Sequence, residues 1–336
     1  MPETVARVYR GNREESVHYG SIAVLDKHGK LTHYLGDPEF FTFVRSSSKP
    51  FQLIPLVESG AADHFKFTPK QLSVMCGSHT GTDHHRTTVI ANLEVAGNSA
   101  DNLKCGCHVP IFMTLKAVFP TAGEERDPLR HNCSGKHSGF LALAKFLGED
   151  VETYLDLDSK VQKMVLKRVS DLYEYPEDMI ELGVDGCSAP NFGLPLKYTA
   201  IAFRRLAMAE GKDERESKVL ARIRDAMMEY PEMVSGEGRF DLALMNSFPG
   251  NVVCKVGAES IEGIGFKNEQ IGIAVKIHDG NQRALYPVCI EVLRQLGIID
   301  DPLKYEHLAP FYKAEIINYR KILTGRVSPE FTLKKA

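Results

Sequence analysis

The chain has 336 residues, of which 43% are hydrophobic and 25% charged, and its formal net charge is −3. This composition is typical of a soluble globular protein that is long enough to bury a sizeable core. A pI near 6.5 and the absence of a run of basic residues argue against a protein that binds nucleic acid or an anionic membrane. The expected partner is therefore a small molecule.

Cysteine content and hydropathy indicate the compartment. Nothing in the first fifteen residues resembles a secretion signal, and no apolar stretch approaches the roughly 20 residues that span a bilayer. We therefore expect a cytoplasmic protein. An odd number of cysteines in such a chain makes a disulfide framework improbable. The seven are Cys76, Cys105, Cys107, Cys133, Cys187, Cys254 and Cys289.

The first third of the chain combines strand and helix signals. Residues 16–26 and 31–37 flank the turn KHGK and predict a β-hairpin, and FFTFV at 40–44 adds a strand. A helix is predicted from Lys49, because Pro50 is tolerated in a first turn. Two further helices are predicted, one from Thr68 to Gly77 and one from Thr82 or Asp83 to Gly97.

The middle of the chain is helical and strand character returns late. Helices are predicted over 137–148, 158–175, 198–211, 214–230 and 282–297, and short β-branched strands over 251–258, 260–266 and 271–280. No linker or repeat divides the chain, so we expect one catalytic domain over residues 1–336. The order of elements predicts an α+β fold, in which an antiparallel sheet is built from both termini and carries a helical insert.

A serine and a lysine three residues apart are the first candidates for chemistry. On a helix Ser46 and Lys49 would share a face, and a serine beside an amine can act as nucleophile and base. A capping serine with a solvated lysine gives the same pattern. Ser78 in the turn CGSHTG and Lys255 in K-x-G complete an order found in penicillin-recognising serine enzymes. Alternatively, Ser78 is a plain turn residue and Lys255 a salt-bridge lysine.

A lysine can take a proton from serine only when its pKa falls from about 10.4 toward neutrality. Burial and a nearby second ammonium group both lower a lysine pKa. Lys255 could supply that second charge to Lys49. We therefore expect two uncharged amines beside hydroxyl groups in one cleft.

Two glycine-rich loops, HNCSGKHSG at 131–139 and VDGCSAPNFG at 184–193, supply potential metal ligands. Cys133, His137, Asp185 and Cys187 are suitable ligand types if the loops converge, and thiolates favour zinc. Lys136 could coordinate only as a neutral or modified amine. Two alternatives remain open, namely buried small thiols in tight turns and a cysteine nucleophile paired with His137.

Taken together, the motifs resemble the L-asparaginase II family of Rhizobium type, the thermolabile asparaginase class. The resemblance runs from about residue 5 to residue 325 and rests on RSSSKPFQ, CGSHTG, NCSGKHSGFLA, DGCSAP, KVGAE and IGIAVKIHDGNQRA. NCSGKH and DGC-x-A-P are its most specific parts. Two departures stand out, since SSSK has serines where relatives often carry apolar residues, and Ser260 replaces a common glycine.

The resemblance implies hydrolysis of L-asparagine to L-aspartate and ammonia, on a fold similar to serine β-lactamases and glutaminases, by a homodimer. It also implies two serine–lysine pairs, Ser46 with Lys49 and Ser78 with Lys255. The zinc-associated residues it implies are Cys133, Lys136 and Cys187, with Asp185 beside them. We expect zinc to support the reaction by positioning substrate and loops, and not to generate the nucleophile.

An acyl-transfer mechanism follows, with Ser46 favoured over Ser78 as nucleophile because Ser46 lies near the positive end of a helix dipole. Arg45 and His137 are the predicted binding groups for the substrate amino acid. Two other classes fit the same residues. One is a penicillin-binding or β-lactamase-like acyl enzyme, and the other is a non-catalytic metal-binding sensor of amino acids.

Overall fold

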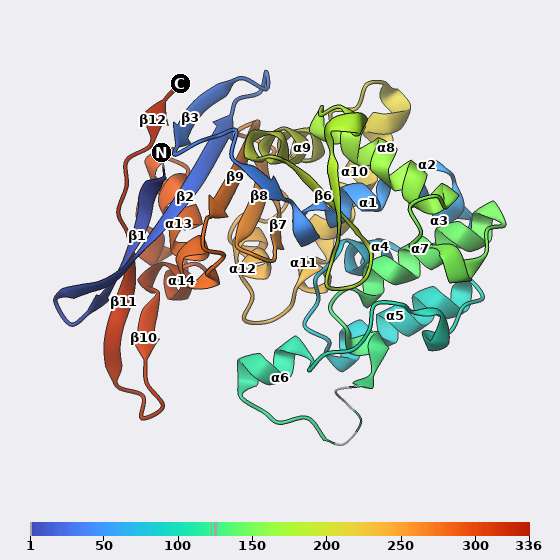
Figure 1. Ribbon diagram of the computed structural model, residues 1–336, viewed down its shortest axis with the longest axis horizontal. Coiled ribbons are helices and arrows are strands. Elements are labelled where there is room, and N and C mark those ends of the chain that lie inside the picture. The colour runs from blue at the N-terminus through green and yellow to red at the C-terminus, as the bar shows by residue number, and fades with distance from the viewer. Residues whose placement is uncertain (1, 122, 124–125) are drawn as a thin grey trace.

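The structure is a computed structural model that describes residues 2–121, 123 and 126–336 (Figure 1). Its main element is a nine-stranded sheet in which every pairing is antiparallel. The strands follow the order β10-β11-β1-β2-β9-β8-β7, with β3 beside β2 and β12 beside β3. They are β1 (Glu3–Arg10), β2 (Arg13–Leu25), β3 (Leu31–Leu35), β7 (Val252–Gly257), β8 (Ile261–Phe266), β9 (Ile271–Ile277), β10 (Glu315–Ile317), β11 (Leu323–Pro329) and β12 (Lys334–Lys335).

Both ends of the chain build this sheet, which confirms the predicted α+β class. The central pairing joins β2 to β9, with Ala23 opposite Ala274. The hairpin of β2 and β3 and the three late strands were predicted. Strands β1, β10, β11 and β12 were missed. β1 is interrupted by Arg7 and carries Arg10 at its end, and most residues of β10 and β12 are exposed, so none of them has a strong apolar pattern.

The helical insert lies beside the β7 edge of the sheet (Figure 1). The helix predicted from Lys49 is two short helices, because Pro50 and Pro55 each occupy a first turn. Within the described residues, no helix combines the length and apolar character that a bilayer crossing needs. The helices are α1 (Lys49–Gln52), α2 (Ile54–Glu58), α3 (Ala61–His64), α4 (Pro69–Cys76), α5 (Asp83–Val95), α6 (Ile111–Lys116), α7 (Ser134–Leu147), α8 (Lys160–Tyr173), α9 (Leu196–Met208), α10 (Glu214–Glu229), α11 (Pro231–Val234), α12 (Phe240–Ser247), α13 (Gln282–Gln295) and α14 (Ala309–Lys313).

Helix α9 packs directly on the sheet because glycines clear a path for it. A β-carbon at Gly265 would lie 2.1 Å from the Phe203 carbonyl oxygen, and one at Gly272 would lie 2.0 Å from the Ala200 carbonyl oxygen. Any side chain there would push α9 away from β8 and β9. Strand β4 (Phe41–Phe43), predicted from FFTFV, belongs to a separate small sheet with β6 (Pro190–Pro195) and β5 (Glu181–Val184).

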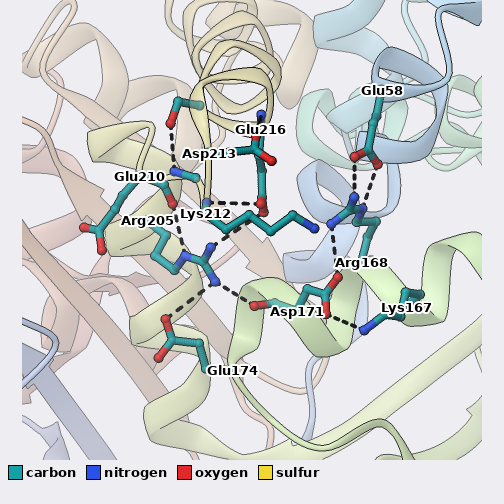
Figure 2. Close-up of polar contacts among 12 residues, drawn as sticks. Glu58, Lys167, Arg168, Asp171, Glu174, Arg205, Glu210, Lys212, Asp213 and Glu216 are labelled. Carbon is teal, nitrogen blue, oxygen red and sulfur yellow. Dashed lines mark hydrogen bonds and ion pairs between the residues drawn. The ribbon is translucent and has the colours of Figure 1, made fainter.

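A network of charged side chains ties the insert together (Figure 2). Arg205 on α9 donates to the Asp171 carbonyl oxygen at 2.6 Å and lies 3.6 Å from the Glu216 carboxylate on α10. Arg168 on α8 makes a two-point ion pair with Glu58. Glu216 is almost fully buried, so its charge depends on Arg205.

We predict that Arg205→Met lowers the free energy of unfolding by roughly 3 kcal/mol, because it leaves the Glu216 carboxylate buried without its cation. Urea denaturation monitored by circular dichroism measures this loss. Lys167→Met is the matched control. It breaks an exposed pair with Asp171 and should cost below about 1 kcal/mol. Equal effects of the two substitutions would contradict a structural role for the buried pair.

Candidate active site

The two candidate serines meet at a cavity of about 290 Å³ beside β7, the strand that ends the large sheet. Ser46 comes from a 3-10 helix, η1 (Arg45–Ser48), and Ser78 from the loop after α4. The fold thus brings together segments from the N-terminal region and the late strands. The rest of the wall consists of Asn132, Arg239, Val256, Gly257, Ala258, Glu259, Ser260, Gly280 and Gln282.

Only one of the three consecutive serines lines this cavity. Ser47 and Ser48 are buried and donate to the carbonyl oxygens of Val44 at 2.6 Å and Arg45 at 2.8 Å. Ser46 is half-buried and lies in the cavity wall. Local hydrogen bonding therefore leaves Ser46 as the serine of this run that a ligand can reach.

A glycine lets η1 approach the sheet edge closely. A β-carbon at Gly257 would lie 2.8 Å from the Val44 carbonyl oxygen. Arg45 adopts a left-handed backbone with φ of 50°, and its amide donates to the Asn191 side chain. The glycine of K-x-G was expected to bring the strand close to a ligand. In the structure it also seats the serine-bearing helix on that strand.

Lys49 is fully buried behind the serines. Its Nζ donates to the Gly77 carbonyl oxygen at 2.7 Å, to Ser78 Oγ at 2.9 Å and to the Asn132 carbonyl oxygen at 3.4 Å. Burial, reinforced by the nearby charges of Lys255 and Lys136, lowers the pKa of Lys49, although Cys133 opposes this effect. A lowered pKa is what a lysine base requires.

The serine–lysine pairing differs from the expected one. The Lys49 amine is hydrogen-bonded to Ser78, and among the described residues no hydrogen bond joins it to Ser46. The backbone carbonyls of Gly77 and Asn132 converge on this amine and draw it toward the Ser78 loop. The shared helical face predicted for Ser46 and Lys49 could not anticipate these long-range acceptors.

Lys255 has an anionic partner that the sequence did not reveal. Its Nζ donates to the Val256 carbonyl oxygen at 2.7 Å and lies 3.3 Å from Asp241 Oδ2. The salt-bridge alternative for Lys255 is therefore what the structure contains, at a fully buried strand edge. Asp241 lies on α12, and its spacing from Lys255 gives no sequence signal.

The two cysteine loops converge as expected. Lys136 Nζ donates to Cys187 Sγ at 3.3 Å. Donation from the Cys187 thiol, with the charges of Lys49 and Lys136, holds the pKa of Cys133 well below its usual range, although burial opposes this. The result is a buried thiol pair with a lysine as its counter-ion.

The other predicted ligands have different partners. Asp185 accepts from the Arg45 guanidinium at 2.8 Å and 2.9 Å, and Arg45 lines a neighbouring cavity of about 520 Å³. His137 is fully buried, and its Nδ1 is 2.7 Å from the Tyr154 hydroxyl. Neither Arg45 nor His137 lines the cavity that holds the serines.

The thiol pair has the donor chemistry of a zinc site. The buried His137 Nε2 lies beside Cys187 and makes no hydrogen bond of ordinary geometry within the described residues, so it could complete a sulfur and nitrogen set. A different group has the closer geometry, however. Within the described residues, Asp241, Cys254 and Glu262 place three possible metal-ligand atoms within 4.8 Å of one another. This second cluster was not predicted, because its members come from α12, β7 and β8.

A family model for L-asparaginase II matches residues 6–329, nearly the whole chain. The chain belongs to the L-asparaginase II family. Membership in the L-asparaginase II family supports an amidohydrolase that acts on a small molecule, and asparagine is the amide for which the family is named. No curated protein matches the chain significantly.

Solved structures give more distant likenesses. The chain is similar to Mglu in its tris and glutamate form, at 16% identity and a TM-score of 0.37, over 83% of this chain and 59% of that one. A putative β-lactamase from Bacteroides dorei DSM 17855 matches at 10% identity, a TM-score of 0.40 and coverage of 82% and 93%. The octameric penicillin-binding protein homologue from Pyrococcus abyssi matches at 14% identity and a TM-score of 0.35, over 90% of this chain and 79% of that one. The chain thus spans less than two thirds of Mglu.

A buried histidine pair behind the site makes stability sensitive to acid. His79 and His85 stack with ring centroids 5.0 Å apart, and His79 Nε2 is 2.9 Å from Ser134 Oγ. Burial lowers the pKa of His85 to about 4. Unfolding exposes this group and restores a pKa near 6.5. The unfolded chain then binds the proton first, so stability falls as the pH drops from 6.5 toward 4.

We predict that His85→Gln makes the free energy of unfolding less dependent on pH. Between pH 7 and pH 5 the substitution should remove roughly 2 kcal/mol of the loss seen in the unsubstituted protein. Urea titrations at both pH values measure this difference. The exposed neighbour His84 is the control, and His84→Gln should leave the pH dependence unchanged. An unchanged slope in His85→Gln would show that His85 titrates normally.

Proposed function

We propose that the protein hydrolyses the side-chain amide of L-asparagine with Ser46 as nucleophile. The observation that carries this proposal is the buried Lys49 amine, hydrogen-bonded to Ser78 at the cavity that Ser46 also lines. An amine with a lowered pKa is uncharged near neutral pH and can accept a proton, whereas a solvated lysine is already protonated. Family membership supports the amide as the target.

The proposed first step forms an acyl enzyme. The Ser46 oxygen attacks the amide carbon, and its proton passes through the Ser78 hydroxyl to Lys49 Nζ. Backbone amides of the cavity wall hold the oxyanion. The tetrahedral intermediate then breaks its carbon–nitrogen bond, and the departing nitrogen takes the proton from Lys49 as ammonia leaves.

The second step reverses these roles. Water attacks the ester carbon and gives a proton to Lys49, and the Ser46 oxygen leaves with that proton as aspartate is released. Burial favours the uncharged form of Lys49, and the positive charge of Lys255, paired with Asp241, acts in the same direction. We propose that one domain carries all these groups, and the homodimer implied by the resemblance remains a prediction.

Ser46→Ala and Ser78→Ala should each lower kcat for ammonia release from asparagine by about 100-fold or more, because one removes the nucleophile and the other the proton relay. A coupled ammonia assay with asparagine and with glutamine measures this. Ser47→Ala is the matched control, since that hydroxyl donates to the Val44 carbonyl oxygen and does not line the serine cavity, and it should keep its activity. Full activity in both the Ser46 and Ser78 variants would refute the serine mechanism.

We also propose that zinc binds at Cys133 and Cys187, beside Lys136 and Asp185. The convergence of two thiols next to a buried imidazole nitrogen supports this proposal. When bound, the metal would polarise or position the substrate amide. The serines would still supply the nucleophile.

Zinc content after dialysis against zinc and then buffer, measured by mass spectrometry, tests the site directly. Cys133→Ala and Cys187→Ala should lose the metal, because thiolates dominate its affinity. Cys254→Ala is the control and should retain it. Loss of zinc only in Cys254→Ala would assign the metal to the cluster of Asp241, Cys254 and Glu262 instead. No zinc in the unsubstituted protein would contradict both assignments.

A further inference from the structure

The serine cavity also contains a cation, Arg239, in its wall. Arg239 precedes α12 and lies half-buried in the cavity wall. Across the described ranges, no hydrogen bond or ion pair reaches its guanidinium, and its Nε is buried without an acceptor. A desolvated guanidinium donor is unfavourable unless an acceptor meets it, and a carboxylate meets it best.

A carboxylate lies on the same wall. Glu259 is exposed in the turn between β7 and β8, and within the part of the chain described here its carboxylate has no hydrogen bond or ion pair. The nearby cation is Lys276, whose amine donates to the Glu259 carbonyl oxygen and whose charge acts on Glu259. Glu259 and Ser260 both have left-handed backbones, with φ of 61° and 57°. Residues with a β-carbon adopt this conformation reluctantly, and such strain gathers at ligand sites.

A glycine leaves room for the Glu259 carboxylate at the cavity wall. Gly280 also lines the cavity, and a β-carbon there would lie 2.3 Å from Glu259 Oε2. The carboxylate therefore lies close to the Gly280 backbone. A larger residue at position 280 would displace it.

The nearest other role for Arg239 is charge balance. Its charge acts on Glu262, which is fully buried and has two carboxylate oxygens without partners. Yet Arg239 forms no ion pair with Glu262, and Asp241 already has Lys255. Part of the Arg239 guanidinium is thus left for a ligand in the cavity.

From these positions we infer that Arg239 binds the α-carboxylate and Glu259 the α-ammonium group of the substrate. This inference rests on the proposed function and names its substrate class, a free α-amino acid whose side-chain amide reaches Ser46. The substrate carries opposite charges on one carbon, and the cavity offers an opposite charge for each. Arg45, predicted for this role, is instead engaged by Asp185.

Two analogues separate the contributions of the charges. Succinamic acid is asparagine without its ammonium group, and 3-aminopropanamide is asparagine without its α-carboxylate. Michaelis or inhibition constants for all three compounds would be measured for the unsubstituted protein, Arg239→Met and Glu259→Gln. Arg320 and Glu94 are exposed and do not line this cavity, so Arg320→Met and Glu94→Gln serve as matched controls. Thermal unfolding of each variant reports any structural damage.

Arg239→Met should weaken the binding of asparagine and of succinamic acid by about tenfold or more, and it should leave the binding of 3-aminopropanamide unchanged. Glu259→Gln should weaken the binding of asparagine and of 3-aminopropanamide, and it should leave the binding of succinamic acid unchanged. The controls should change none of the constants. A uniform weakening of all three compounds, or no weakening, would overturn the inference and leave Arg239 as a partner of Glu262.

A different readout separates this inference from the proposed function. If the unsubstituted protein hydrolyses none of the amides, the proposed function fails, and calorimetric binding of L-aspartate then tests the inference. Weaker aspartate binding in Arg239→Met and Glu259→Gln would support it. Equal binding in all variants, or no binding to the unsubstituted protein, would overturn it.

Discussion

A lysine amine buried away from water is the constraint on which the site depends. Among the described residues Lys49 has no carboxylate partner, and its amine donates to two backbone carbonyls and the Ser78 hydroxyl, while the nearby Cys133 thiol acts against the lowering of its pKa. Burying a charged ammonium in this way is costly, so the neutral form is favoured. The same environment that destabilises the ammonium makes the amine a usable base, and Lys255 and Lys136 add like charge that acts in the same direction.

The fold creates this environment by joining distant segments at one sheet edge. Gly257 on β7 lets η1 pack against the strand. Helix α4 ends at Gly77 and Ser78, which accept hydrogen bonds from the Lys49 amine. Gly77 itself has no room for a side chain, since a β-carbon there would lie 2.5 Å from the Met233 carbonyl oxygen. The glycines around the site thus allow close backbone packing. Their contribution to the chemistry is indirect, because that packing positions the reacting side chains.

Sequence reasoning succeeded where a signal was local. The hairpin of β2 and β3, the helices with clear caps and the two serines that line the cavity could be predicted from short patterns, whereas Arg239 and Glu259 in the same wall were not predicted. It failed where partners come from afar. Asp241 beside Lys255, Ser78 beside Lys49 and Arg45 beside Asp185 are contacts between elements, and no spacing encodes them. Strands with exposed or charged residues, such as β10 and β12, were missed for the same reason, because tertiary pairing alone defines them.

The central claim is that the buried Lys49 amine makes Ser46 a nucleophile. Rapid quenching of the protein with asparagine in acid, followed by peptide mass spectrometry, would reveal the covalent intermediate. The account predicts an aspartyl ester on the peptide that contains Ser46, and no ester when Lys49 is replaced by methionine. An adduct on Cys133, or an ester that forms equally well without the Lys49 amine, would contradict it.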